Sequence, residues 1–231
     1  MLKKRTLLVA GFTCSLIFVT ISIAVVSPST HLGSLLSSLD QLLMSSFRVP
    51  SEADDPIGPS WFEEAARDIT ALGSVSSLGL IVTIGVVMLL TLGRTRSAAV
   101  LVHGSLGCFL FNSLLKSFFD RPRPNLVPHE AVVFTPSFPS GHAMVSASTF
   151  ATMAFLLIRS TLFINHKPRI FLIAATSIIL IGTSRVYLGV HWPSDVFAGW
   201  SAGIAWSCLT VALFCVDRVR APKDCTRLRK S

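Results

Sequence analysis

The sequence predicts an all-α protein, a six-span transmembrane helical bundle with amphipathic interfacial helices between spans 1 and 2. Three observations predict this fold. Of the 231 residues, 51% are hydrophobic and only 14% are charged, which leaves too few charges for an ordinary soluble domain. The hydrophobic residues gather in six long runs, each near the length that crosses a bilayer. The basic residues gather at alternate ends of these runs, as the positive-inside rule describes.

The first hydrophobic run covers residues 7–26 and follows Lys3, Lys4 and Arg5. A basic start before an apolar run also occurs in signal peptides, but their apolar core is usually about 7–15 residues long. This run has about 20 residues, enough to cross a bilayer, and no good small-x-small cleavage site precedes Pro28. We therefore expect residues 1–27 to form a cytoplasmic end and an uncleaved first transmembrane helix.

Residues 28–71 have a different pattern and are expected to form an extracytoplasmic amphipathic segment. Apolar residues recur there at helical spacing, with serine and aspartate between them, at Leu32, Leu35, Leu36, Leu39, Leu43 and Phe47. This spacing predicts a helix at the membrane surface, which Pro50 ends. Residues 51–60 then predict a turn-rich acidic linker, and residues 61–69 a second short amphipathic helix. The segment suits either a lid over the helix ends or a platform that guides a lipid headgroup.

The remaining hydrophobic runs are expected to form a five-span core over residues 72–216, followed by a basic cytoplasmic tail over residues 217–231. The runs cover residues 72–92, 98–115, 143–158, 170–186 and 196–216. The chain also has five cysteines, at positions 14, 108, 208, 215 and 225. Their spacing resembles neither a metal site nor a disulfide framework. We interpret four of them as small apolar filler and Cys225 as a thiol in the tail.

The distribution of charge predicts the orientation of the bundle. With the N-terminus in the cytoplasm, 14 of the 20 basic residues lie inside: Lys3, Lys4, Arg5, Arg94, Arg96, Arg159, Lys167, Arg169, Arg218, Arg220, Lys223, Arg227, Arg229 and Lys230. Such a bias sets the topology of a multi-pass protein. We therefore expect a cell (inner) membrane protein with both ends inside. The net charge of +8 then reflects cytoplasmic anchoring and requires no nucleic-acid partner.

Three polar clusters fall on the outer side in this topology. They are Lys116 with residues 120–124, the sequence Pro-Ser-Gly-His at residues 139–142, and residues 184–195. The second cluster lies just before an apolar run, where a helix N-terminus would offer unpaired backbone N–H groups to a phosphate-like anion. Together the clusters supply lysine, arginine, two histidines and an aspartate. These are the groups needed to bind a phosphoryl group and to move a proton beside it.

At these clusters the chain resembles the type 2 phosphatidic acid phosphatase superfamily. The first motif of that family, Lys, six residues, Arg-Pro, matches Lys116 and Arg123-Pro124. The second, Pro-Ser-Gly-His, matches residues 139–142. The third, Ser-Arg, five residues, His, three residues, Asp, matches Ser184-Arg185, His191 and Asp195. Three complete motifs in order, spread over about half of the chain, make the resemblance specific.

The resemblance implies a role for each motif residue. His191 would be the nucleophile that forms a phosphohistidine, Asp195 would hold its other ring nitrogen, and His142 would be the general acid. Phosphate binding would fall to Lys116, Arg123, Ser140, Gly141 and Arg185. Catalysis would need no metal and no cofactor, because the sequence shows no carboxylate cluster suited to Mg²⁺. For the neighbouring Arg121, His129 and Glu130 we favour a role in loop structure or headgroup fine-tuning.

The expected activity is hydrolysis of a phosphomonoester or diphosphate headgroup at the outer membrane interface, with the active site facing the periplasm or exterior. Candidate substrates are phosphatidic acid, phosphatidylglycerol phosphate, undecaprenyl diphosphate and lipid A phosphate. The alternative is a non-enzymatic membrane transporter or scaffold. A transporter would carry ionisable groups near the bilayer midplane, whereas these charges gather at one face. The specific lipid and the oligomeric state stay open.

Overall fold

The structure, a computed structural model, describes residues 4–50, 52–125 and 135–214. Its elements are α1 (Lys4–Val26), α2 (His31–Ser45), β1 (Arg48–Val49), β2 (Glu52–Pro56), α3 (Ser60–Ala71), α4 (Val75–Thr91), α5 (Thr95–Val102), a π-helical turn η1 (His103–Gly107), α6 (Cys108–Phe118), α7 (Gly141–Arg159), a 3-10 turn η2 (Thr161–His166), α8 (Lys167–Tyr187) and α9 (Pro193–Phe214). The predicted all-α fold is confirmed.

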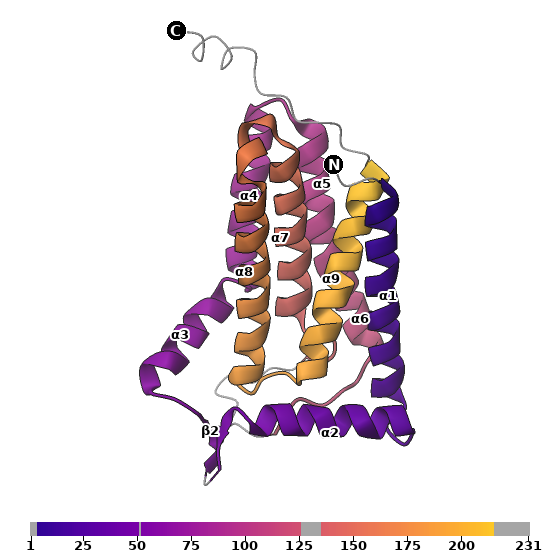
Figure 1. Cartoon of the computed structure of the whole chain (residues 1–231), viewed down its shortest axis with the longest axis vertical. Coiled ribbons are helices and arrows are strands. Elements are labelled where there is room, and N and C mark those ends of the chain that lie inside the picture. Colours follow the sequence, from indigo (N-terminus) through magenta and orange to yellow (C-terminus); the bar gives the residue numbers. More distant parts are fainter. Residues whose placement is uncertain (1–3, 51, 126–134, 215–231) are drawn as a thin grey trace.

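The predicted membrane spans appear as a bundle of long apolar helices (Figure 1). Within the described residues, five helical stretches are each long and apolar enough to cross a membrane: α1, α5 to α6, α7, α8 and α9. The sixth span is α4, a 17-residue helix that passes the same test together with α3, from which it is bent by 48°. The six-span prediction is therefore confirmed when the bent pair counts as one span.

Helix α7 occupies the centre of the bundle and packs against its neighbours through small residues (Figure 1). At Gly203 of α9, an added Cβ would lie 2.2 Å from the carbonyl oxygen of Met144, so only glycine permits this approach of α9 to α7. Buried hydroxyls complete the packing, and Ser148 Oγ donates to the carbonyl of Gly104 across 2.6 Å. Close backbone approach and interhelical hydrogen bonds are the usual means of packing helices in a membrane.

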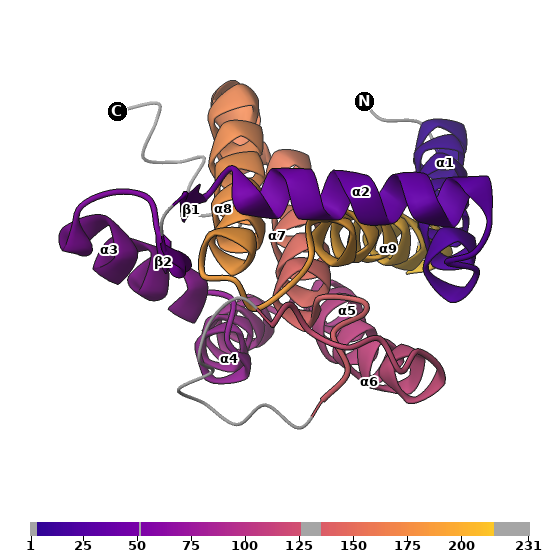
Figure 2. The ribbon, with the colours of Figure 1, turned by 90° about the horizontal axis from the view of Figure 1, so that it is seen from below.

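The amphipathic segment forms a platform across one end of the bundle (Figures 1 and 2). Helix α2 lies roughly perpendicular to the spans and passes beneath α7, α8 and α9. Its N-terminus is capped by Thr30, whose Oγ1 accepts from the backbone N–H of Gly33. Most of its leucines are exposed on the surface of the chain, whereas its buried face carries Gly33, Asp40 and Met44. Both predicted amphipathic helices are thus present, with the leucine stripe facing away from the bundle.

The linker prediction for residues 51–60 was wrong in its first half, because the chain forms a two-stranded antiparallel sheet there. Strand β1 pairs with β2, with Arg48 opposite Pro56. Tertiary contacts hold the hairpin against the end of α8: Arg48 is buried and donates to the carbonyl of Tyr187 at 2.9 Å. The Tyr187 hydroxyl in turn donates to the carbonyl of Ile57 at 2.9 Å. These long-range bonds satisfy groups that the local sequence leaves unpaired.

Candidate active site

Four helix ends meet at the platform, and each carries predicted site residues. Helix α6 ends just after Lys116, and α7 begins at Gly141, with Ser140 as its N-cap. Helix α8 carries Arg185 in its last turn, and α9 begins at Pro193, which places Asp195 in its first turn. The remaining predicted residues, Arg123 and His191, lie in the connecting loops. All three clusters predicted from the sequence therefore meet at one end of the bundle.

His191 and Asp195 form a buried pair at the start of α9. His191 Nδ1 lies 3.5 Å from Asp195 Oδ2, and the same carboxylate oxygen accepts from the backbone N–H of Trp192 at 2.9 Å. Ser137 Oγ also donates to Asp195 Oδ2 and lies 3.3 Å from His191 Nδ1. The other ring nitrogen, Nε2, lies 3.3 Å from a guanidinium nitrogen of Arg123. One edge of the imidazole thus faces a carboxylate, and the opposite edge faces cations.

The surroundings of His191 favour its neutral form. The side chain is 3% exposed, and burial lowers its pKa to about 4, although the hydrogen bond and charge of Asp195 act in the opposite direction. A neutral imidazole that donates from Nδ1 to Asp195 keeps the lone pair on Nε2. That tautomer presents a nucleophilic nitrogen toward the cationic side of the site.

Three cations surround the site, and each donates a hydrogen bond to an uncharged group. Lys116 Nζ donates to the carbonyl of Pro136 at 2.6 Å, and Arg123 donates to the carbonyl of Val190 at 2.7 Å. Arg185 donates to Thr70 Oγ1 of α3 at 3.0 Å. Burial also lowers the pKa of Arg123, opposed by the charge of Asp195. Since carbonyls and hydroxyls do not cancel these charges, the site has an excess of positive charge that an anion would neutralise.

Two buried polar atoms near these cations have no hydrogen-bond partner among the described residues. They are Ser140 Oγ, at the N-cap of α7, and Arg185 Nε. Burying a polar group without a partner is costly. A bound phosphoryl group would supply acceptor oxygens to both atoms, and to the free backbone N–H groups at the start of α7.

His142 lies in the first turn of α7, at the end of an apolar cavity of about 470 Å³. The cavity runs between α4, the α5–α6 span and α7, and Leu78, Val82, Leu106 and Phe109 contribute to its lining. Within the described part of the chain, no hydrogen bond engages the imidazole of His142. It lies within electrostatic range of Arg185, His191, Lys116 and Arg123. His142 therefore lies between the polar site and this apolar cavity, which we call the apolar groove beside His142.

A buried chain of charges links the platform to the site. Arg121 donates to Asp195 Oδ1 at 2.6 Å and to Asp40 Oδ2 at 2.7 Å. Asp40, on the buried face of α2, also accepts from the backbone N–H of Ser194 at 2.8 Å and from its hydroxyl. The guanidinium of Arg121 lies 5.7 Å from the centroid of the Trp192 ring. Arg121 thus ties its loop to α2 and α9. His129 and Glu130, for which the sequence also favoured loop structure or headgroup fine-tuning, lie outside the described residues.

Sequence reasoning missed Asp40, Thr70 and Ser137, which hold Arg121, Arg185 and Asp195 respectively. Each is a common polar residue outside the motifs, so no local signal marked it. Among the described residues, no group of three or more His, Cys, Asp or Glu side chains could hold a metal ion.

Comparisons with known proteins give consistent matches. A family model described as PAP2 superfamily matches residues 80–216. Phosphatidylglycerophosphatase B of Bacillus subtilis is 36% identical over 170 residues, which cover 67% of this chain and 76% of that protein. An undecaprenyl-diphosphatase of Sulfolobus acidocaldarius is 31% identical over 54% of this chain and 60% of its own length. The crystal structure of a transmembrane PAP2 type phosphatidylglycerolphosphate phosphatase from Bacillus subtilis superposes with a TM-score of 0.75 at 27% identity, covering 87% of this chain and 94% of that one.

Proposed function

Since the chain belongs to the PAP2 superfamily, we propose that it is an integral-membrane phosphatase that hydrolyses a phosphomonoester or diphosphate headgroup of a lipid through a phosphohistidine on His191. The observation that carries this proposal is the environment of His191. Its Nδ1 faces Asp195 at 3.5 Å, and its Nε2 faces Arg123 at 3.3 Å. A neutral nucleophile held by a carboxylate and aimed at a cluster of cations suits attack on phosphorus.

In the first step, the lone pair of His191 Nε2 attacks phosphorus and the bond from phosphorus to the leaving oxygen breaks. Positive charge that develops on the imidazole is stabilised by Asp195 through Nδ1–H. Lys116, Arg123 and Arg185 neutralise the phosphoryl oxygens. His142 gives its proton to the leaving oxygen as general acid.

In the second step, water attacks the phosphohistidine, His142 takes the proton of that water, and the bond between Nε2 and phosphorus breaks. Phosphate leaves, His191 returns to its neutral form and His142 is protonated for the next turnover. Ser140 Oγ and the backbone N–H of Gly141 complete the phosphate cradle, which agrees with the unpartnered Ser140 hydroxyl. We assign this chemistry to residues 72–216, and it requires neither a metal nor a cofactor.

The apolar groove beside His142 supports a lipid as the substrate. The groove has a volume of about 470 Å³, is lined by α4, the α5–α6 span and α7, and reaches His142 and Gly141. A headgroup in the cradle would leave its acyl or prenyl chain in this groove, within the depth of the membrane. Phosphatidic acid, phosphatidylglycerol phosphate, undecaprenyl diphosphate and lipid A phosphate all combine a phosphate with such a chain. A non-enzymatic transporter or scaffold would have no need of a nucleophile placed in this way.

We further propose that the protein resides in the inner membrane and that its active site faces the periplasm or exterior. The support is the charge distribution, since 14 of the 20 basic residues belong to the opposite end by sequence and basic loops stay in the cytoplasm. Residues 28–71 then lie outside. Through Asp40 and Thr70 they position Arg121 and Arg185. These contacts favour a platform that guides the headgroup over a lid that only covers the helix ends.

The test is release of phosphate from a panel of these four lipid classes by the purified full-length chain in detergent, combined with rapid-quench labelling. We expect acid-labile, base-stable phosphate on His191 and none in His191→Ala. A single strongly preferred lipid would define the substrate. Turnover of lipid phosphate by His191→Ala, or labelling of another residue, would overturn the mechanism.

A further inference from the structure

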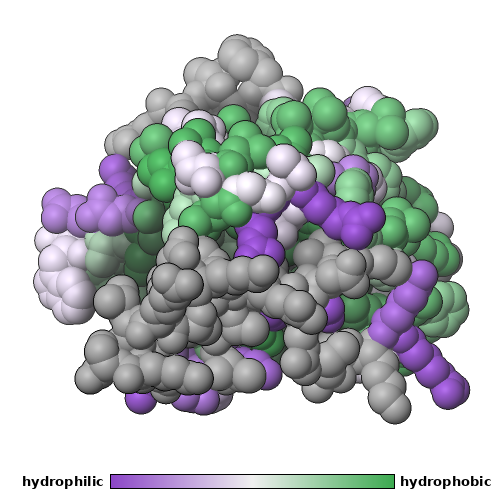
Figure 3. Space-filling view, turned by 90° about the horizontal axis from the view of Figure 1, so that it is seen from above, coloured by the Kyte–Doolittle hydropathy of each residue, from purple (hydrophilic) through white to green (hydrophobic). Residues whose placement is uncertain are grey.

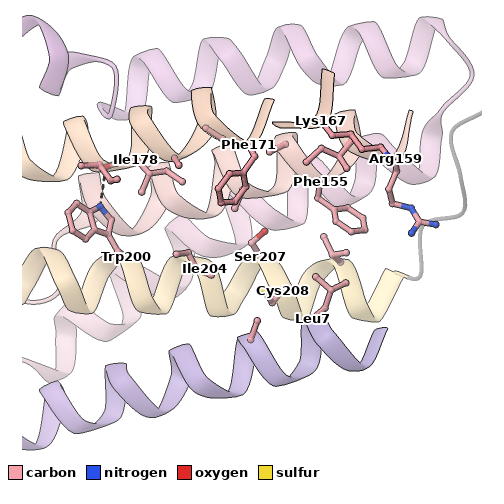
Figure 4. Close-up of a pocket in the computed structure, with 18 of the residues that line it drawn as sticks. Leu7, Phe155, Arg159, Lys167, Phe171, Ile178, Trp200, Ile204, Ser207 and Cys208 are labelled. Carbon is pink, nitrogen blue, oxygen red and sulfur yellow. Dashed lines mark hydrogen bonds between the residues drawn. The ribbon is translucent and has the colours of Figure 1, made fainter. Parts of the chain in front are cut away.

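A second apolar groove lies among α1, α7, α8 and α9, and it extends from Trp200 to Arg159 and Lys167 at the end of the bundle opposite the active site (Figure 4). Its volume is about 510 Å³, and its lining comes from α1, α7, α8 and α9. Helices α8 and α9 are joined where Trp200 Nε1 donates to the carbonyl of Ile178 at 3.1 Å. From that point they diverge toward the end of the bundle opposite the active site (Figure 1). The groove is therefore a wedge that is closed near Trp200 and wide at that end.

Two basic residues line the wide end of the groove. Arg159 is the last residue of α7 and Lys167 is the first residue of α8, and both belong to the lining (Figure 4). The guanidinium of Arg159 lies 5.5 Å from the centroid of the Phe155 ring, which holds it beside the groove. Its buried Nε has no hydrogen-bond partner among the described residues. The groove thus has an apolar lining and two basic side chains at its wide end, which we call its mouth.

No carboxylate of the described chain is available to neutralise this mouth. The acidic residues of the described part fall within residues 40–68 and at Asp120 and Asp195, all at the active-site end (Figure 1). The tail over residues 217–231 carries six basic residues against two acidic ones, so its charge disfavours it as an occupant. Figure 3, which views the opposite end, shows hydrophilic and hydrophobic side chains side by side on this face. The complementary occupant is an anion that carries an apolar chain.

We propose that this groove binds an anionic phospholipid from the leaflet opposite the active site, with an acyl chain between α8 and α9 and its headgroup phosphate at Arg159 and Lys167. A wedge between lipid-facing helices must be filled by hydrocarbon, because water there would leave its hydrogen bonds unmet. The cations then select the headgroup, since basic side chains near an anionic leaflet attract its lipids. The proposal concerns a site distinct from the phosphatase site and does not depend on the reaction.

Native mass spectrometry of the full chain can test this proposal. The protein is released from nanodiscs of phosphatidylcholine with or without phosphatidylglycerol, a lipid that carries no phosphomonoester. We expect wild type to retain phosphatidylglycerol in preference to phosphatidylcholine. The double variant Arg159→Gln with Lys167→Gln should bind it about 30-fold more weakly, the effect of losing two cations near the surface. The control, Arg94→Gln with Arg169→Gln, removes two cations of the same end that do not line the groove and should keep the preference.

Fluorescence locates the lipid independently. Phosphatidylglycerol with brominated acyl chains should quench Trp200 at the closed end of the groove, and the quenching should fall in Trp200→Phe and in the double variant. Vanadate, which would occupy the phosphatase site, should change neither result. Equal retention of the two lipids by wild type, equal losses in the double variant and its control, or quenching that Trp200→Phe leaves intact would each overturn the proposal.

Discussion

Replacing Asp40 by Asn tests whether the platform positions the active site. Asp40 is 3% exposed, and its carboxylate accepts from Arg121 at 2.7 Å and from the backbone N–H of Ser194 at 2.8 Å. Asparagine keeps the shape of the side chain and can still accept from Ser194. It removes the negative charge of Asp40, one of the two carboxylates that pair with Arg121. Because Arg121 keeps Asp195 as a partner, the loss is that of hydrogen bonds to a charged group, about 1.5–3 kcal/mol. For a chain of this size, such a loss lowers the Tm by roughly 3–12 °C.

The substitution should also change the kinetics in a specific way. Without Asp40, the guanidinium of Arg121 pairs with Asp195 alone, so the carboxylate stabilises the imidazolium of His191 less well. Asp195 also orients His191, so a shift of Asp195 would misplace the nucleophile. Such a misplacement costs roughly ten- to a hundredfold in rate. We expect this loss in kcat, with KM little changed, because in our proposal neither Asp40 nor Arg121 binds the phosphate.

The assay combines thermal unfolding, followed by tryptophan fluorescence in detergent, with steady-state phosphate release. Trp192 lies 5.7 Å from Arg121 and should report the local change. Asp68→Asn is the matched control, since it removes the same charge from α3, the other platform helix, at an exposed position. If Asp40→Asn matches Asp68→Asn in both Tm and kcat, the charge chain does not position the site and the reasoning is wrong.

Three further predictions follow from the proposed mechanism and a fourth from the proposed topology. Because burial lowers the pKa of His191 to about 4, the nucleophile stays mostly neutral at pH 5.5, where an ordinary histidine would be mostly protonated. The acid limb of kcat/KM assigned to it should therefore fall near pH 4, and a limb near 6.5 from this residue would contradict its burial. His142→Ala should slow release of an alcohol leaving group by roughly 10²–10⁴-fold and cost less with p-nitrophenyl phosphate; equal losses would argue against a general acid. EDTA should leave activity largely intact while vanadate inhibits, and rescue of an EDTA-inactivated enzyme by Mg²⁺ would refute a metal-free reaction. In a cysteine-free background, an impermeant thiol reagent should label Glu64→Cys from outside the cell and spare Asn165→Cys, and the reverse pattern would invert the topology.

The helices and the motif residues could be predicted because their signals are local. Apolar runs long enough to cross a bilayer predict membrane spans from local sequence alone, and Pro193 marks the start of the turn that brings Asp195 to His191. The supporting residues carry no such signal. Asp40 is separated from Ser194 by 154 positions, and Thr70 from Arg185 by 115. Nothing in their own neighbourhoods distinguishes them from solvated polar residues.

Helix α2 shows a second limit of the sequence pattern. Its leucine stripe predicted an amphipathic helix, and in the structure Leu35, Leu39 and Leu42 are exposed. The face that packs on the bundle carries Asp40 and Met44 instead. In a water-soluble protein the apolar face would be the buried one. At a membrane surface, lipid and protein core attract the same side chains, so hydrophobicity alone cannot say which face meets the bundle.

The contact between α7 and α9 has a consequence for how this scaffold can diversify. Glycine at positions 199 and 203 brings α9 against the backbone of Ser140 and Met144, so the helix that starts beside His142 and the helix that starts near His191 are fixed to each other as one rigid unit. Because His191 lies two residues before the start of α9, this packing helps to fix its position relative to His142. Residues 28–71, by contrast, contact the candidate site through the side chains of Asp40 and Thr70. Exchanging that segment between relatives should therefore leave the packing of α9 on α7 intact, and should lower activity unless the new segment supplies counterparts of Asp40 and Thr70.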